Sequence, residues 1–154
     1  MNYKTQLTLY MEWLWSFDVR ARDGFICQLN PAVQQEAIDH LSCTGVLQGA
    51  HLITRNVKGI KFDLRNGRCL CQAHHKYYTH HPEQWARICV MLWRTDWEYL
   101  MDRKWRTPAF VIDREKVFAN LMHEATVKIG DFPEYTPKLK SIINWMDDQG
   151  GLTP

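Results

Sequence analysis

The sequence has no long uninterrupted run of apolar residues. A membrane-spanning helix needs about 18 of them in succession, and no such stretch occurs. The N-terminal segment is interrupted by Lys4, Glu12 and Asp18, and it lacks the apolar core and small-residue cleavage site of a signal peptide. We therefore expect a cytoplasmic protein.

The cysteines are odd in number, and neither sign of charge dominates. Five cysteines fit a disulfide scheme poorly, and in the cytosol clustered cysteine and histidine more often bind a metal ion. The formal net charge is only +2, so the molecule as a whole is not a polycation. Any attraction for nucleic acid therefore has to come from a local patch.

The chain also lacks internal repeats, low-complexity tracts and a linker long enough to separate two domains. Its 154 residues are one domain's length, and they can bury a core without covalent staples. We predict a single domain over 1–154 with a mostly helical α+β fold.

Helical spacing of apolar residues predicts helices outside the middle of the chain. They cover about 4–20, about 82–100, about 113–128 and about 136–150, with a break around 107–108. Prolines near the start open two of them. Helices of this kind would flank the central region on both sides.

Extended segments are predicted only in the middle of the chain, between the helix at about 4–20 and the helix at about 82–100. Segments 25–27 and 51–53 have strand character, and the alternation of apolar and charged residues over 60–64 predicts a further strand or extended segment. Residues 31–41 resemble an inserted helix, and 71–78 would begin a short one. The middle of the chain should thus be strand, loop, strand and helix.

Three cysteines and a histidine form a candidate structural zinc site. Cys71 and His74 have the two-residue gap that lets one turn present two ligands to a tetrahedral ion, and Cys27 and Cys43 would complete the set. Thiolate and imidazole ligands favour Zn²⁺ over Mg²⁺ or Ca²⁺. The inserted helix would fill the gap between Cys27 and Cys43, and Cys69 is a reserve ligand. The alternative is that all five cysteines are small buried hydrophobes.

Several short motifs follow one another around this site. They read Asp23-Gly-Phe-Ile-Cys27, Ala50-His51-Leu-Ile, Phe62-Asp63-x-x-Asn66 and Leu70-Cys71-x-x-His74-His75. Their order and spacing resemble the HNH endonucleases, most closely a phage-encoded branch, over about 20–95. The resemblance implies a ββα-metal finger with a zinc knuckle as the nuclease core at 20–95, and helical flanks at 1–19 and 96–154.

The resemblance implies three catalytic residues, His51, Asn66 and His75. His51 would be the general base that takes a proton from the attacking water, and an ordinary imidazole pKa of about 6.5 suits that role near neutral pH. His75 would hold a divalent ion, Mg²⁺ or another, that stabilises charge on the phosphate and the leaving oxygen. Asn66 would brace the loop and the orientation of His51.

The chain departs from the family pattern at two positions. Ala50 stands where many HNH enzymes have Asp or His as a metal ligand, so a second ligand has to come from elsewhere. His80 is the first choice and Asp63 the next. His74 stands where the family usually has cysteine, which leaves open a swap in which His74 binds the catalytic ion and His75 the zinc.

A basic loop accompanies the motifs. Charge runs often form a solvated face, but beside a metal site we expect cations to contact phosphates and make binding salt-dependent. The predicted DNA-binding residues are Arg55, Lys58, Lys61, Arg65 and Arg68.

The sequence thus leads to the hypothesis of a zinc-stabilised, metal-dependent DNA endonuclease of low sequence specificity. The resemblance implies a phage-encoded protein acting in the host cytoplasm, with phage packaging proteins as partners by family association alone. The first alternative is the same finger without cutting, as a zinc-stabilised DNA-binding or packaging accessory protein. A zinc-stapled interaction protein is a third class, but it would leave the basic loop unexplained.

Overall fold

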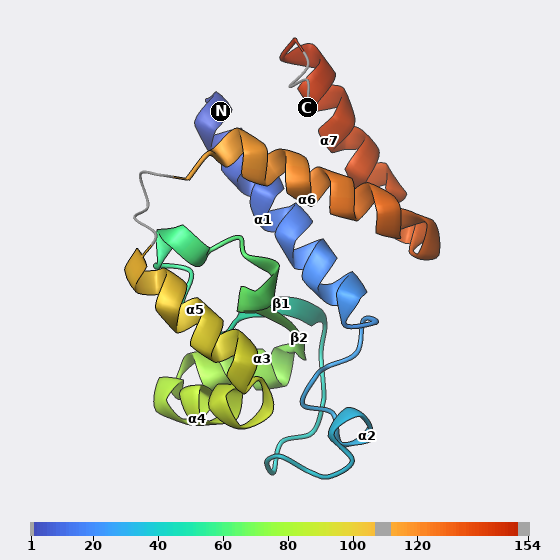
Figure 1. Cartoon of the computed structure of the whole chain (residues 1–154). Helices are drawn as coiled ribbons and strands as arrows, with labels where there is room; N and C mark the ends of the chain where they lie inside the picture. The colour runs from blue at the N-terminus through green and yellow to red at the C-terminus, as the bar shows by residue number, and fades with distance from the viewer. Residues whose placement is uncertain (1, 107–111, 151–154) are drawn as a thin grey trace.

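The computed structural model describes residues 2–106 and 112–150. This part of the chain is mostly helical and holds one small antiparallel sheet, as the predicted α+β class requires (Figure 1). None of its helices combines the length and apolar character that crossing a membrane requires. The helices and strands are α1 (Tyr3–Arg22), α2 (Pro31–Gln34), β1 (Leu47–His51), β2 (Gly67–Cys71), α3 (Gln72–Thr79), α4 (Pro82–Leu92), α5 (Arg94–Arg106), α6 (Arg114–Lys128) and α7 (Thr136–Asp148).

Helix α1 connects the two halves of the structure. It begins where the side-chain oxygen of Asn2 accepts a hydrogen bond from the Thr5 amide at 2.9 Å, which satisfies one of the free N–H groups of the first turn. Along its length α1 packs against α6 on one side and against β1 and β2 on the other (Figure 1). The structure has two cores, and the buried apolar residues of α1 all belong to the one that it shares with α6.

The two cores are distinct clusters of buried side chains. The first joins α1, α6 and α7 through residues such as Phe17, Phe118 and Ile142. The second joins the sheet to α4 and α5 through residues such as Leu70, Cys89 and Leu100. Burial of these apolar side chains is the main source of the fold's stability.

The sheet pairs β1 with β2 in an antiparallel register that sets Leu47 opposite Cys71 and His51 opposite Gly67. Gly67 is required because α1 comes very close at this point. A Cβ on Gly67 would lie 2.5 Å from a methyl group of Val19 and 2.7 Å from the Trp15 ring. The close approach brings α1 against the end of β1, where His51 lies.

Two local predictions of extended structure are wrong. Segment 25–27 is not a strand, because Phe25 has φ 53° and belongs to the left-handed turn that follows α1. Segment 60–64 is not a strand either: it runs from the end of one 3₁₀ turn, Lys58–Ile60, to the start of another, Leu64–Asn66. Its alternation arises because Ile60 enters the second core while Phe62 and Leu64 pack on the first.

Two helix predictions need correction as well. The inserted helix predicted over 31–41 is the single turn α2, which ends where Gln35 has φ 65°. The helix predicted over about 82–100 is divided into α4 and α5 at Trp93, whose φ is −134°. Trp93 packs against Trp85 and lies under the Arg68 guanidinium. The break predicted around 107–108 lies outside the described residues.

The helices predicted over 4–20, 71–78, 113–128 and 136–150 are confirmed to within a few residues as α1, α3, α6 and α7. The second strand of the pair is β2, at 67–71, and it leads directly into α3. The order strand, loop, strand and helix therefore holds for the middle of the chain, but the first strand lies at 47–51 rather than the predicted 51–53, and the second lies further along than predicted. This unit carries both groups of candidate site residues.

Candidate functional site

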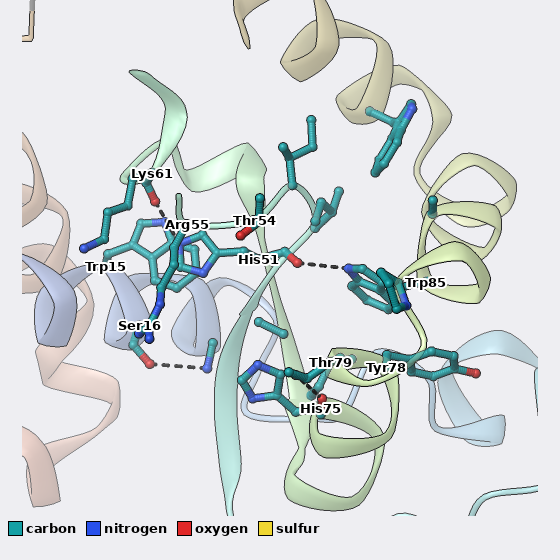
Figure 2. Close-up of a pocket in the computed structure, with 18 of the residues that line it drawn as sticks. Trp15, Ser16, His51, Thr54, Arg55, Lys61, His75, Tyr78, Thr79 and Trp85 are labelled. Carbon is teal, nitrogen blue, oxygen red and sulfur yellow. Dashed lines mark hydrogen bonds between the residues drawn. The ribbon is translucent and has the colours of Figure 1, made fainter. Parts of the chain in front are cut away.

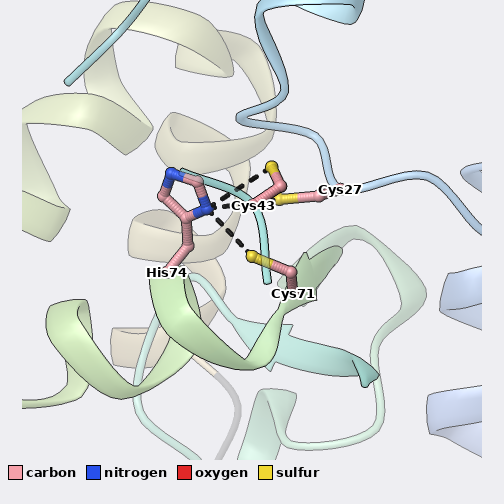
Figure 3. Close-up of side chains that lie close together, drawn as sticks. All are labelled: Cys27, Cys43, Cys71 and His74. Atoms are coloured by element: carbon pink, nitrogen blue, oxygen red, sulfur yellow. Dashed lines mark hydrogen bonds between the residues drawn. The ribbon is translucent and has the colours of Figure 1, made fainter. Parts of the chain in front are cut away.

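The four predicted zinc ligands come together at one place (Figure 3). Cys71 ends β2 and His74 lies in the first turn of α3. The chain around Cys27 is held to β2 by the Gln28 amide, which donates to the Cys69 carbonyl at 2.8 Å. The segment after Cys43 is held to α3 by a backbone hydrogen bond from Ala73 to Thr44, 3.2 Å long. Backbone contacts thus bring distant parts of the chain to one site.

The spacing of this cluster is compatible with a bound metal ion. The ligand atoms of Cys27, Cys43, Cys71 and His74 lie within 4.8 Å of one another. His74 Nδ1 is 3.7 Å from the sulfurs of Cys27 and Cys43 and 3.0 Å from that of Cys71. Metal–ligand lengths of about 2.0–2.3 Å imply ligand separations of about 3.5–3.8 Å. The cluster can therefore hold a metal ion such as zinc, and Cys69 is not part of it.

The electrostatics of the cluster favour the charged forms of both the His74 imidazole and the Cys71 thiol. Hydrogen bonding to the Cys27 and Cys71 sulfurs raises the pKa of His74 to about 9, although burial acts in the opposite direction. Burial opposes ionisation of Cys71, but hydrogen bonds with His74 outweigh it and lower the pKa of that thiol to about 7. Three sulfurs around one imidazole are thus suited to a cation, and a metal ion would bind there in competition with protons.

Asp39 is a residue of this site that the sequence analysis missed. One carboxylate oxygen lies 3.3 Å from His74 Nε2, and the other accepts a hydrogen bond from the Tyr78 hydroxyl at 2.5 Å. Metal-bound histidines commonly have such a carboxylate on the second ring nitrogen, where it fixes the ring's orientation. The available signal was an acidic residue in the segment that joins Cys27 to Cys43.

A cavity of about 820 Å³ lies beside the sheet, and both predicted catalytic histidines line it (Figure 2). His51 comes from the end of β1 and His75 from α3. Arg55 and Lys61 also contribute to the wall. The structure thus brings His51 and His75 to a common space.

The His51 ring is held in one orientation by two neighbours. It stacks on Trp15 with ring centroids 4.0 Å apart and an interplanar angle of 11°. Its Nε2 lies 2.9 Å from the Lys61 carbonyl oxygen, which can only accept, so Nε2 carries the proton in the neutral ring. Nδ1 is then an unprotonated acceptor. Burial lowers the pKa of His51 to about 4, and the charges of Lys61 and Arg55 add to the effect.

His75 is oriented by Gln48, a second residue that the sequence analysis missed. His75 Nδ1 lies 2.7 Å from the Gln48 amide oxygen, so Nδ1 donates and Nε2 is left unprotonated for a metal ion. The feature of the sequence that could have indicated this role is a polar side chain on β1, one residue before Gly49. Gly49 lies on the face of the strand that packs against α1. Alternation along the strand puts Gln48 on the opposite face.

Asn66 is buried and braces the loop between the two strands. Its side-chain nitrogen donates to the carbonyls of Ile53 and Ile60 at 3.0 and 3.1 Å, and its oxygen accepts from the Ile53 amide at 2.8 Å. These bonds fix the loop as the resemblance implied. Any influence on His51 passes through the backbone, because the Asn66 carbonyl accepts from the Leu52 amide next to His51.

The two residues predicted as the second catalytic metal ligand do not lie with His75. The Asp63 carboxylate accepts hydrogen bonds from the Arg65 amide and the Tyr99 hydroxyl, and it lines a different cavity. His80 is exposed at the end of α3 and does not line the His51 cavity. The one carboxylate among the residues lining that cavity is Glu12, which is paired with Lys61.

The five predicted DNA-binding cations divide into two groups. Lys61 and Arg68 are buried, and they pair with Glu12 and Asp96. Arg68 also donates to the Gly67 carbonyl at 2.6 Å, so its guanidinium is used inside the fold, and a phosphate contact by it stays a prediction. The exposed cations are Arg55, Lys58 and Arg65, and the half-buried Lys104 of α5, which was not predicted, lines the His51 cavity with Arg55.

Comparison with known proteins adds no relative to this picture. No protein-family model matches the chain, and no match was found among curated proteins or solved structures.

Proposed function

We propose that the protein is a metal-dependent endonuclease that hydrolyses phosphodiester bonds in DNA. One observation carries the proposal: His51 and His75 converge on one cavity from different elements, with Arg55 on the same wall. Each imidazole has one nitrogen fixed by an oxygen acceptor, Lys61 O for His51 and Gln48 Oε1 for His75. Each therefore presents its other nitrogen unprotonated, one as a base and one as a ligand.

The residues of the chain divide the work of hydrolysis. His51 Nδ1 accepts a proton from the water that attacks phosphorus, while the Lys61 carbonyl and the Trp15 ring keep the imidazole in place. Arg55 neutralises phosphate charge through its guanidinium. His75 Nε2 offers a ligand atom for a divalent ion, which when bound would supply charge stabilisation to the phosphate and the leaving oxygen.

The sequence resemblance supports the same proposal. The order of β1, the Asn66 loop, β2 and α3 is compatible with the ββα-metal finger of the HNH endonucleases. We propose that zinc in the Cys27, Cys43, Cys71 and His74 cluster is structural, because four protein ligands leave no open position for substrate. The phage origin, the low sequence specificity and the packaging partners stay predictions.

One observation favours the rival function, a zinc-stabilised DNA-binding module that does not cut. The small buried side chain of Ala50 stands where a second metal ligand is usual, and neither His80 nor Asp63 replaces it. Mg²⁺ commonly keeps several waters and takes few protein ligands, which allows His75 to be one of very few.

A plasmid-nicking assay separates the two functions. Supercoiled DNA is incubated with the protein and Mg²⁺, Mn²⁺, Ni²⁺ or Zn²⁺, and the relaxed form is measured on a gel. We expect nicking by the wild type, loss of nicking with retained DNA binding in His51→Ala, and no change in the exposed control His80→Ala. DNA binding without nicking in all four metals would overturn the endonuclease and favour the module.

A further inference from the structure

The His51 cavity has two unlike walls, and only one of them is explained by phosphodiester chemistry. The polar wall carries His51, Arg55 and His75. The other wall is apolar and comes largely from α4 and α5, with Trp85 and Trp97 among its residues. These side chains also pack in the second core, but a phosphate and a water make no use of an aromatic surface, so the part that lines the cavity can take a second occupant.

Helix α5 presents three residues to the cavity along one face. Trp97, Met101 and Lys104 follow one another at intervals of four and three residues, which puts them in a row on the helix. All three are half-buried. The row sets an aromatic ring and a thioether next to a cation.

Trp97 differs from the other two tryptophans of the cavity. Trp15 stacks on His51 and donates its indole N–H to the Asp63 carbonyl at 3.1 Å. Trp85 contacts the Tyr78 ring and donates to the His51 carbonyl at 2.9 Å (Figure 2). Within residues 2–106 and 112–150, Trp97 has neither an aromatic partner nor a hydrogen bond from its indole. The ring packs partly against the second core, and the part of it that lines the cavity is available to a ligand.

We propose that this cavity takes one unstacked nucleobase of a DNA strand, stacked on Trp97, while Arg55 and Lys104 bind the neighbouring phosphates. The substrate class is then DNA with unpaired nucleotides rather than uninterrupted duplex. This inference rests on the proposed function, which assigns a phosphodiester to the polar wall. A flat aromatic base beside an anion matches an indole beside two cations, and such stacking tolerates any base sequence.

The size of the cavity supports the same occupant. A volume of about 820 Å³ is within the range of small-molecule sites, about 300–1,000 Å³. It can admit a nucleotide but not a paired double helix. A base held in this way has to leave its stack, which costs least in a strand that is already unpaired.

Equilibrium binding tests the inference without requiring cleavage. A fluorescently labelled single-stranded oligonucleotide and a blunt duplex of the same sequence are titrated with the zinc-loaded protein, with no other divalent ion added, and anisotropy is recorded. We expect the single strand to bind about tenfold more tightly or better. Trp97→Leu, which keeps an apolar side chain but removes the aromatic plane, should lose about tenfold in single-strand affinity, and Trp97→Phe should retain most of it.

Trp105 provides the matched control, because it lies on the same helix but is 77% exposed and does not line the cavity; its ring contacts Lys104, which the substitution leaves in place. Trp105→Leu should leave single-strand affinity unchanged. Equal affinity for the two DNA forms, or equal effects of Trp97→Leu and Trp105→Leu, would overturn the inference. If the protein does not nick DNA but shows this binding pattern, the endonuclease proposal fails and the proposed base-binding site stands. If the protein nicks duplex DNA at a rate that Trp97→Leu does not change, the endonuclease proposal stands and the base-binding site fails.

Discussion

His75 and Gln48 are joined by a hydrogen bond between ring and amide, with 2.7 Å between Nδ1 and Oε1. The bond connects α3 to β1 and fixes which ring nitrogen of His75 carries a proton. Gln48 touches no reacting atom in the proposed mechanism. It is a positioning residue whose effect passes through His75.

The first prediction concerns this bond. Gln48→Ala should lower the nicking rate about 10- to 100-fold and raise the concentration of divalent ion needed for half-maximal rate, because the imidazole loses its orientation. Gln48→Glu, whose carboxylate still accepts from Nδ1, should retain most of the activity. Metal titrations of the two variants provide the measurement. An equal loss in both, with no shift in metal dependence, would contradict the positioning role.

The second prediction concerns the protonation of His51. Because burial lowers its pKa to about 4, the ring should remain a neutral base throughout the mildly acidic range. An ordinary imidazole would lose roughly tenfold of its base form between about pH 7.5 and pH 5.5, and His51 should lose almost none. NMR titration of the ring protons, with the His51→Ala spectrum for assignment, measures the midpoint directly. A midpoint near 6.5 would show that the ring is not buried as described.

The third prediction concerns zinc. We expect one zinc ion per chain by atomic emission, lost in Cys43→Ser and retained in Cys69→Ala, because Cys69 is outside the cluster. Loss of the ion should lower Tm by about 5 °C or more, the shift expected for about 2 kcal/mol in a chain of this size. Zinc retained in Cys43→Ser, or lost in Cys69→Ala, would mean that the ligand set is wrong.

The fourth prediction separates the two groups of cations. Arg55→Ala should weaken DNA binding and reduce the slope of log affinity against log salt by about 1, with stability unchanged, because this side chain is exposed. Arg68→Ala should leave that slope unchanged and destabilise the fold by about 2 kcal/mol or more, because Asp96 and two backbone carbonyls lose their donor. Salt titrations and urea denaturation of both variants make the comparison. The reverse pattern would restore Arg68 to the DNA-binding set.

The outcome for the metal cluster shows what the sequence could determine. Cys71 and His74 are predictable from spacing alone, because one turn of chain places them. Cys27 and Cys43 follow from residue type, since few other thiols remain. Asp39 and Gln48 are not predictable in this way, because each acts only on a neighbour that tertiary packing brings to it. No sequence pattern indicates which residue a polar side chain in a loop or on a strand will contact.

The loop between β1 and β2 shows why periodicity fails in a connecting segment. The alternation over 60–64 is typical of a strand that has one buried face. Here the chain instead passes between two cores, and the apolar side chains of Ile60 and Phe62 are divided between them. The buried amide of Asn66 then holds the loop in its irregular path. Alternating apolar and charged residues indicate only that neighbouring side chains point in different directions. A β-strand has this property, and so can an irregular loop.

The fifth prediction concerns Asp18, which is completely buried in α1. Neither carboxylate oxygen has a hydrogen-bond partner among the described residues. Burial raises the pKa of this group to about 8, and the charge of Lys128 only partly opposes the effect. The folded protein therefore keeps a proton that the unfolded chain releases above about pH 4.

The sign of the pH dependence follows from that difference. Between about pH 4 and pH 8 the unfolded state binds fewer protons at this residue, so its contribution to the free energy of unfolding falls by roughly 1.4 kcal/mol per pH unit. Asp18→Asn cannot titrate and should gain roughly 3 kcal/mol relative to wild type between about pH 5 and pH 7. Urea denaturation at the two pH values measures the gain. The exposed control Asp131→Asn should show none, and a stability difference between Asp18→Asn and wild type that does not change with pH would mean that Asp18 is ionised in the folded protein.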